Sequence, residues 1–155
     1  MRRTFGIVLA VAALALAAGC GKKPTTAPEP PPSLAGGWTL VGVEAKGTKL
    51  TEADLAKQQS LAERKIRATA DKMIATKDGK DDPLSYKLDA TKTPHEIDMT
   101  ETKADGKTET MYGIYKLEGD ILTICAVPST NPADRPKEFK TAPDNKAMIL
   151  TLKKD

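Results

Sequence analysis

The chain is 155 residues long and carries 24 Lys or Arg against 21 Asp or Glu, so its formal net charge at pH 7 is +3. This length suits one folded domain with one core. So small a charge, without a clustered basic face, gives no electrostatic case for a nucleic-acid-binding protein. Arg2 and Arg3 lie in a segment that we expect to be removed, which leaves 22 basic against 21 acidic residues and a charge of +1.

Residues 1–20 have the pattern of a bacterial lipoprotein signal. Arg2 and Arg3 precede an apolar run over residues 5–18, and small residues lead up to Cys20. The run is shorter than the ~20 residues that a transmembrane helix needs, and small residues before a cysteine suit a signal peptidase. We therefore expect residues 1–19 to be a signal peptide and Cys20 to carry the lipid, with palmitate among its acyl chains. The two arginines also match part of a twin-arginine export signal, but general secretion is favoured.

Lipidation of Cys20 sets the expected location. It anchors the mature protein to a membrane on the periplasmic side. Gly21 is not the aspartate that resembles an inner-membrane retention signal, so the outer membrane is favoured over the inner. Residues 20–35 then form the lipidated cysteine and a linker, because five of the chain's 11 prolines lie between residues 21 and 34. Such a segment is extended, and at ~3.1 Å per residue it holds the domain up to roughly 40 Å from the membrane.

Residues 36–155 have the composition of a globular domain made of short strands. Glycine-containing turns separate β-prone runs, and alternation of apolar and polar residues is clear in several of them. Met111, Gly113 and Tyr115 share one face of their run, for example. Regular short strands joined by hairpin turns predict an antiparallel barrel or sandwich. The expected strands cover residues 37–43, 65–77, 84–89, 96–103, 109–117, 121–127, 138–141 and 146–153.

One segment departs from the strand pattern. Residues 50–63 are rich in helix formers, and Thr51 with Asp54 resembles a capping box. We expect one short helix after the first strand. Its apolar stripe is thin, with Leu55 as one member, so we expect it to lie against an end of the barrel.

Several blocks resemble known families. Gly36-Gly37-Trp38 resembles the Gly-x-Trp signature of lipocalins, in which the tryptophan packs across one end of a barrel. Blocks at residues 86–98, 113–125 and 135–139 are similar, in this order, to a small domain family abundant in planctomycete bacteria. That family has no assigned function and itself resembles lipocalin-type barrels. The resemblance covers residues 36–153 and implies an all-β, antiparallel, lipocalin-like barrel of about eight strands, with no catalytic residues to transfer.

The residues themselves favour a protein without catalytic chemistry. His95 is the single histidine and follows Pro94 in an expected turn, where a solvated role is the simplest. With Cys20 lipidated, Cys125 has no disulfide partner, and its apolar setting predicts a buried core residue. Asp78, Asp81 and Asp82 crowd one loop without the spacing of a calcium loop, so a solvated turn is the simplest interpretation. We expect no enzyme, no cofactor and no metal.

Two kinds of function remain. In the first, the barrel interior holds a small apolar ligand, and the candidate interior residues are Trp38, Tyr115 and Met111. In the second, the barrel is filled by its own side chains, and the protein is a structural or protein-interaction module of the cell envelope. An eight-strand barrel is just wide enough for either arrangement. The space left inside the barrel separates the two hypotheses.

Overall fold

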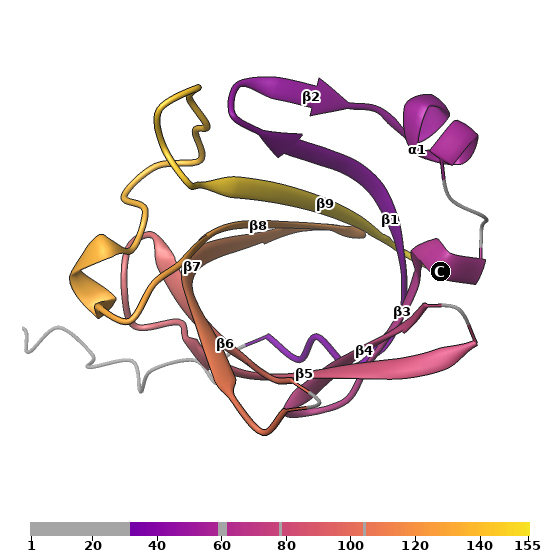
Figure 1. The fold of residues 1–155 in the computed structure, drawn as a ribbon, viewed down its shortest axis with the longest axis horizontal. Helices are drawn as coiled ribbons and strands as arrows, with labels where there is room; N and C mark the ends of the chain where they lie inside the picture. The colour runs from indigo at the N-terminus through magenta and orange to yellow at the C-terminus, as the bar shows by residue number, and fades with distance from the viewer. Residues whose placement is uncertain (1–31, 59–61, 78, 104) are drawn as a thin grey trace, which may run out of the picture.

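Eight of the nine strands described in the computed structural model form a closed antiparallel barrel (Figure 1). The structure describes residues 32–58, 62–77, 79–103 and 105–155. Strands that follow one another pair around the barrel, and β1 closes it by pairing with β9. The prediction of an all-β barrel of about eight strands is confirmed. The barrel strands are β1 (Gly36–Ala45), β3 (Lys65–Ala68), β4 (Lys72–Lys77), β5 (Lys80–Asp89), β6 (His95–Thr102), β7 (Thr108–Glu118), β8 (Ile121–Pro128) and β9 (Met148–Lys154).

The first strand pairs with three others. Its first half pairs with β3 and its second half with the short strand β2 (Thr48–Leu50), while β9 runs along its other edge. The register with β9 shifts between Leu40 and Gly42, which marks a β-bulge. Bulges bend a strand and increase its twist, as closure of a sheet into a barrel requires.

The short helix α1 (Glu52–Gln58) follows β2, so one more strand precedes it than the sequence predicted. Thr51 begins it with half of a capping box: the Thr51 N–H and hydroxyl both donate to Oδ2 of Asp54, at 3.1 and 2.7 Å. These bonds, with the Thr51 hydroxyl ahead of the backbone bond, lower the pKa of the Asp54 carboxyl. Leu55 is the buried residue of α1, which packs on β1 and β2. The 3-10 turn η1 (Ala62–Arg64) leads into β3.

Two strand predictions were wrong. Residues 65–77 form two strands, because Thr69 and Asp71 make a turn in which the Thr69 hydroxyl accepts the N–H of Lys72 at 3.1 Å. Residues 138–141 lie in the loop between β8 and β9, after the 3-10 turn η2 (Pro132–Asp134). A strand there has nowhere to pair, since both edges of β8 and β9 are already occupied.

The barrel has two distinguishable ends. At the end where β1 begins, which we call the closed end, Leu34 and Trp38 are each 1% exposed. The indole Nε1–H of Trp38 donates to the Leu34 carbonyl at 2.7 Å, and in Figure 1 the indigo segment before β1 passes across this opening. At the opposite end, which we call the mouth, lie the β1–β2, β4–β5 and β6–β7 turns and the loop over residues 129–147.

Two apolar clusters stabilise the described part of the chain. The main core fills the barrel with the inward side chains of every barrel strand. A smaller cluster lies outside, where Ala147 of the loop over residues 129–147 is buried together with Ile114 and Cys125 of the barrel. This loop therefore covers the outer face of β7, β8 and β9.

Candidate functional site

A cavity of about 170 Å³ lies inside the barrel, in the half nearer the mouth. Its wall is apolar except for two carboxylates. Three of the lining side chains are methionines, contributed by β4, β6 and β7. The full set of lining residues is Ile66, Met73, Ala75, Asp82, Leu84, Met99, Glu101, Met111, Ile124, Leu150 and Leu152.

Strand alternation and register bring the three methionines together. Met99 pairs directly with Met111 across β6 and β7, and Met73 pairs with Leu84 across β4 and β5. Residues that pair directly lie on the same face of the sheet, which here is the inner one. Methionine is unbranched, flexible and polarizable, so it adapts its shape to what it contacts. This wall can therefore reshape itself around a small molecule.

The two carboxylates lie toward the mouth. Asp82 is exposed and Glu101 is half-buried. Asp81, the neighbour of Asp82, points to the other face, where it accepts the Thr76 hydroxyl at 3.0 Å and lies 3.7 Å from Arg67. Within the described residues, neither Asp82 nor Glu101 forms a hydrogen bond or ion pair through its side chain, although the charge of Glu101 helps to raise the pKa of Lys103. The cavity thus has an apolar wall and a negatively charged rim.

The structure places all three predicted interior residues inside the barrel but brings only one of them to the cavity. Met111 lines it, whereas Trp38 and Tyr115 belong to the packed core. Tyr115 is 1% exposed, and its hydroxyl has no hydrogen-bond partner among the described residues. Burial raises the pKa of this phenol, and the charge of Asp89 adds to the effect.

Sequence reasoning missed the rim. Asp82 was interpreted as part of a solvated loop, and Glu101 was not singled out. A signal for Asp82 was present, because it alternates with Leu84 and Tyr86, which are apolar on one face. Glu101 continues the inner face of Met99 in the same way.

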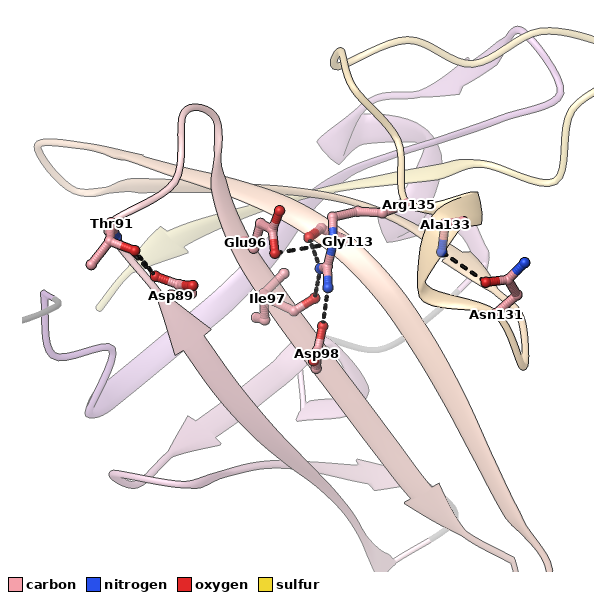
Figure 2. Close-up of polar contacts among 9 residues, drawn as sticks. All are labelled: Asp89, Thr91, Glu96, Ile97, Asp98, Gly113, Asn131, Ala133 and Arg135. Atoms are coloured by element: carbon pink, nitrogen blue, oxygen red, sulfur yellow. Dashed lines mark hydrogen bonds and ion pairs between the residues drawn. The ribbon is translucent and has the colours of Figure 1, made fainter.

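A second constellation fixes the loop over residues 129–147 to the outside of the barrel (Figure 2). Nη1 of Arg135 donates to the carbonyls of Gly113 and Ile97, at 2.6 and 3.1 Å. Nη2 donates to Oδ1 of Asp98 at 2.6 Å, and Nε lies 3.3 Å from Oε2 of Glu96. The Arg135 side chain is only 14% exposed, and every contact that it makes here is within the protein. It is a structural clamp.

Short polar turns flank this clamp. Oδ1 of Asp89 accepts the N–H and the hydroxyl of Thr91, and these bonds lower the pKa of the Asp89 carboxyl. Oδ1 of Asn131 accepts the Ala133 N–H at 3.0 Å and begins η2 (Figure 2). Side chains that bond nearby backbone in this way fix turns. Both are structural features.

His95 and Cys125 lie apart from the cavity. His95 is exposed at the start of β6; its Nδ1 lies 3.0 Å from the Lys92 carbonyl and its ring 5.5 Å from that of Tyr115. Cys125 is 0% exposed under the outer loop, as predicted for a core residue. Burial is the main reason that the pKa of its thiol is raised. A thiol that stays protonated is a poor nucleophile.

Among the described residues, no group of three or more His, Cys, Asp and Glu side chains is arranged to hold a metal ion. No helix in this part of the chain has the length and apolar character needed to cross a membrane. Cys20, the predicted signal peptide and most of the predicted linker lie outside the described residues. Comparisons of the chain with protein-family models, with curated proteins and with solved structures find no match.

Proposed function

We propose that this protein is a lipid-anchored protein of the cell envelope that binds a small apolar ligand inside its barrel and does not catalyse a reaction. The observation that carries the proposal is the cavity of about 170 Å³ with its methionine-rich wall. Apolar cavities of about 150 Å³ accept molecules of the size of benzene. The ligand, or the part of it that enters the cavity, is therefore about as large as one aromatic ring.

The residues of the cavity support binding rather than catalysis. Its described wall offers thioethers, aliphatic groups and the carboxylates of Asp82 and Glu101. A hydrolytic or transfer reaction needs a nucleophile, a base and donors for a developing negative charge in mutual reach. His95 and Cys125, the chain's histidine and its buried thiol, lie outside this wall. Selective binding asks only for shape and for a few polar groups at the rim.

The anchor is supported by the pattern of residues 1–20. We propose cleavage before Cys20, lipidation of its sulfur and an outer-membrane location on the periplasmic side. Cys20→Ala is expected to leave the barrel folded and to abolish incorporation of radiolabelled palmitate. Incorporation that persists in the Cys20→Ala protein would contradict the anchor without bearing on the cavity.

Native mass spectrometry of the protein extracted from its own membranes tests the ligand. We expect a co-purifying small molecule whose release restores the mass of the protein alone. Met111→Trp serves as the matched variant, because its larger side chain occupies the cavity and should prevent the molecule from co-purifying. A mass without any small molecule in both proteins would count against the proposal.

A second candidate function is a structural or protein-interaction module with a filled barrel. One observation favours it: the cavity is smaller than the roughly 300–1,000 Å³ of most ligand pockets, and Met73 and Met99 are each at most 6% exposed. Under this hypothesis the methionines are filling, and the outer surface contacts a partner. Recurrent co-purification of one envelope protein, with no small molecule bound, would support it.

A further inference from the structure

We propose that the ligand of the barrel is a small organic cation, with an apolar body against the methionines and an ammonium group at the rim beside Asp82 and Glu101. The inference rests on the proposed function, because it names the chemical class of the molecule that the same cavity binds. Three features carry it: two carboxylates that form no ion pair among the described residues, the like charges placed opposite one another, and the apolar depth of the cavity.

The first feature is the contrast between two adjacent aspartates of β5. Asp81 faces outward and is matched by Thr76 and Arg67. Asp82 faces inward, lines the cavity and has no matching group among the described residues. The protein thus matches the negative charge that faces away from the cavity and leaves the one at the cavity unmatched.

The second feature is a like-charge pair on the inner face. Glu101 of β6 pairs directly with Glu109 of β7, and like charges directly opposite each other are destabilising. Lys103 compensates the two carboxylates unequally. Its Nζ lies 2.7 Å from Oε2 of Glu109, and the charge of Glu101 adds less than Glu109 does to raising the pKa of Lys103. Glu101 lies on the cavity wall and forms no ion pair among the described residues. A further positive charge at the rim would reduce the remaining repulsion.

The two carboxylates are close enough to share one ammonium. Leu84 pairs with Glu101, and Asp82 lies two residues before Leu84 on the same face. Such diagonal neighbours are typically about 7–8 Å apart, within reach of a single group between long side chains. Lys80, the next residue of this face toward the turn, is exposed and does not line the cavity.

The third feature is the depth behind the rim. Met73, Met99 and Met111 form an apolar wall of the size of one aromatic ring, and methionine sulfur makes favourable contacts with aromatic rings. A ring in the cavity places a one-carbon ammonium arm at the rim, where Asp82 is exposed. The ammonium therefore keeps part of its hydration and is not forced into an apolar interior.

Three probes of equal ring size test the charge preference: benzylammonium, benzyl alcohol and benzoate. Each is titrated at pH 7 into the full chain in detergent micelles, with methionine methyl groups labelled with carbon-13 and the free probe measured. The signals of Met73, Met99 and Met111 report on the cavity, and that of Met148, outside the wall, is the internal reference. We expect benzylammonium to bind about fivefold more tightly than benzyl alcohol, and benzoate to bind most weakly. High salt should reduce the preference for benzylammonium and leave the alcohol unaffected.

Two variants assign the preference to the rim. The double variant Asp82→Asn and Glu101→Gln should bind benzylammonium no more tightly than benzyl alcohol, with the alcohol affinity unchanged. Asp81→Asn removes a neighbouring carboxylate that faces outward, so it should keep the wild-type preference.

The outcomes separate the two proposals. Equal affinity of wild type for benzylammonium and benzyl alcohol would overturn the cationic class and leave the apolar binding site standing. A preference that survives in the double variant would also overturn it, because the rim would not be its source. If none of the three probes shifts the cavity methionines, the small-ligand function itself fails and the inference fails with it.

Discussion

The two ends of the barrel are packed by different kinds of side chain. At the closed end, Trp38, Tyr86 and Tyr115 are buried aromatic residues, at most 6% exposed. Toward the mouth, the inner face carries Met99 and Met111, and a cavity of about 170 Å³ remains. Aromatic rings bury a large area with few rotatable bonds, whereas methionine has three. The closed end is thus built to be stable in one arrangement, and the mouth to adapt.

Truncation of Trp38, the largest side chain at the closed end, should lower the free energy of unfolding the most. Trp38→Ala is expected to lower the free energy of unfolding by about 3–5 kcal/mol, because it creates a large void and removes the donor to the Leu34 carbonyl. Met111→Ala, at the mouth, is expected to cost about 1–2 kcal/mol, because the residue is half-buried and already borders a cavity. Urea denaturation measures both. Equal losses would show that the two ends are packed alike.

Adding side-chain volume should have opposite effects on the free energy of unfolding in the middle of the barrel and at the mouth. A Cβ on Gly113 would lie 2.8 Å from the Cys125 carbonyl oxygen and 2.9 Å from the Ala126 Cβ, so the backbone must shift. Gly113→Ala is therefore expected to cost about 1–3 kcal/mol.

The matched change is Ala75→Val, which adds methyl groups to the wall of the cavity. It should leave the free energy of unfolding unchanged or raise it by up to about 1 kcal/mol, because it fills empty space. Thermal denaturation compares the two variants. Destabilisation of similar size in both would mean that the space beside Ala75 is already filled.

The smallest effects concern two buried hydroxyl groups at the closed end. The Tyr86 hydroxyl donates to the Thr69 carbonyl at 2.7 Å, whereas the Tyr115 hydroxyl has no partner among the described residues. Tyr86→Phe should cost about 1 kcal/mol, and Tyr115→Phe should be neutral or stabilising by up to about 1 kcal/mol. Guanidinium denaturation of both variants checks the difference in sign.

Tyr86 and Tyr115 also predict that the stability of the fold depends on pH. Burial raises the pKa of both phenols above the ordinary value of 10.0. The folded state therefore holds these protons more tightly, and the stability that they contribute is complete below pH 10 and declines as the pH rises above it. Tyr115→Phe should weaken this decline. A decline of equal slope in wild type and variant would contradict the assignment to Tyr115.

The sequence predicted the barrel because its signals are local. Alternation placed Met111, Gly113 and Tyr115 on one face of a strand, and glycine-containing turns marked where neighbouring strands end. Alternation also places Asp82 and Glu101 on inner faces, but it does not bring them together: only the register of β6 with its two neighbours sets Glu101 opposite Leu84 and Glu109 at the cavity. Register and residual volume depend on non-local pairing, which one strand does not encode.

The position of Leu34 has a consequence for orientation. The described chain enters the barrel at the closed end, where Leu34 is buried and Gly37 accepts the N–H of Asp155 at 3.0 Å. If Cys20 anchors the protein as proposed, the chain reaches the barrel from the membrane at the closed end, opposite the mouth. Capture would then draw on solutes dissolved in the aqueous compartment, and molecules dissolved in the bilayer would have to leave it before they could be taken up.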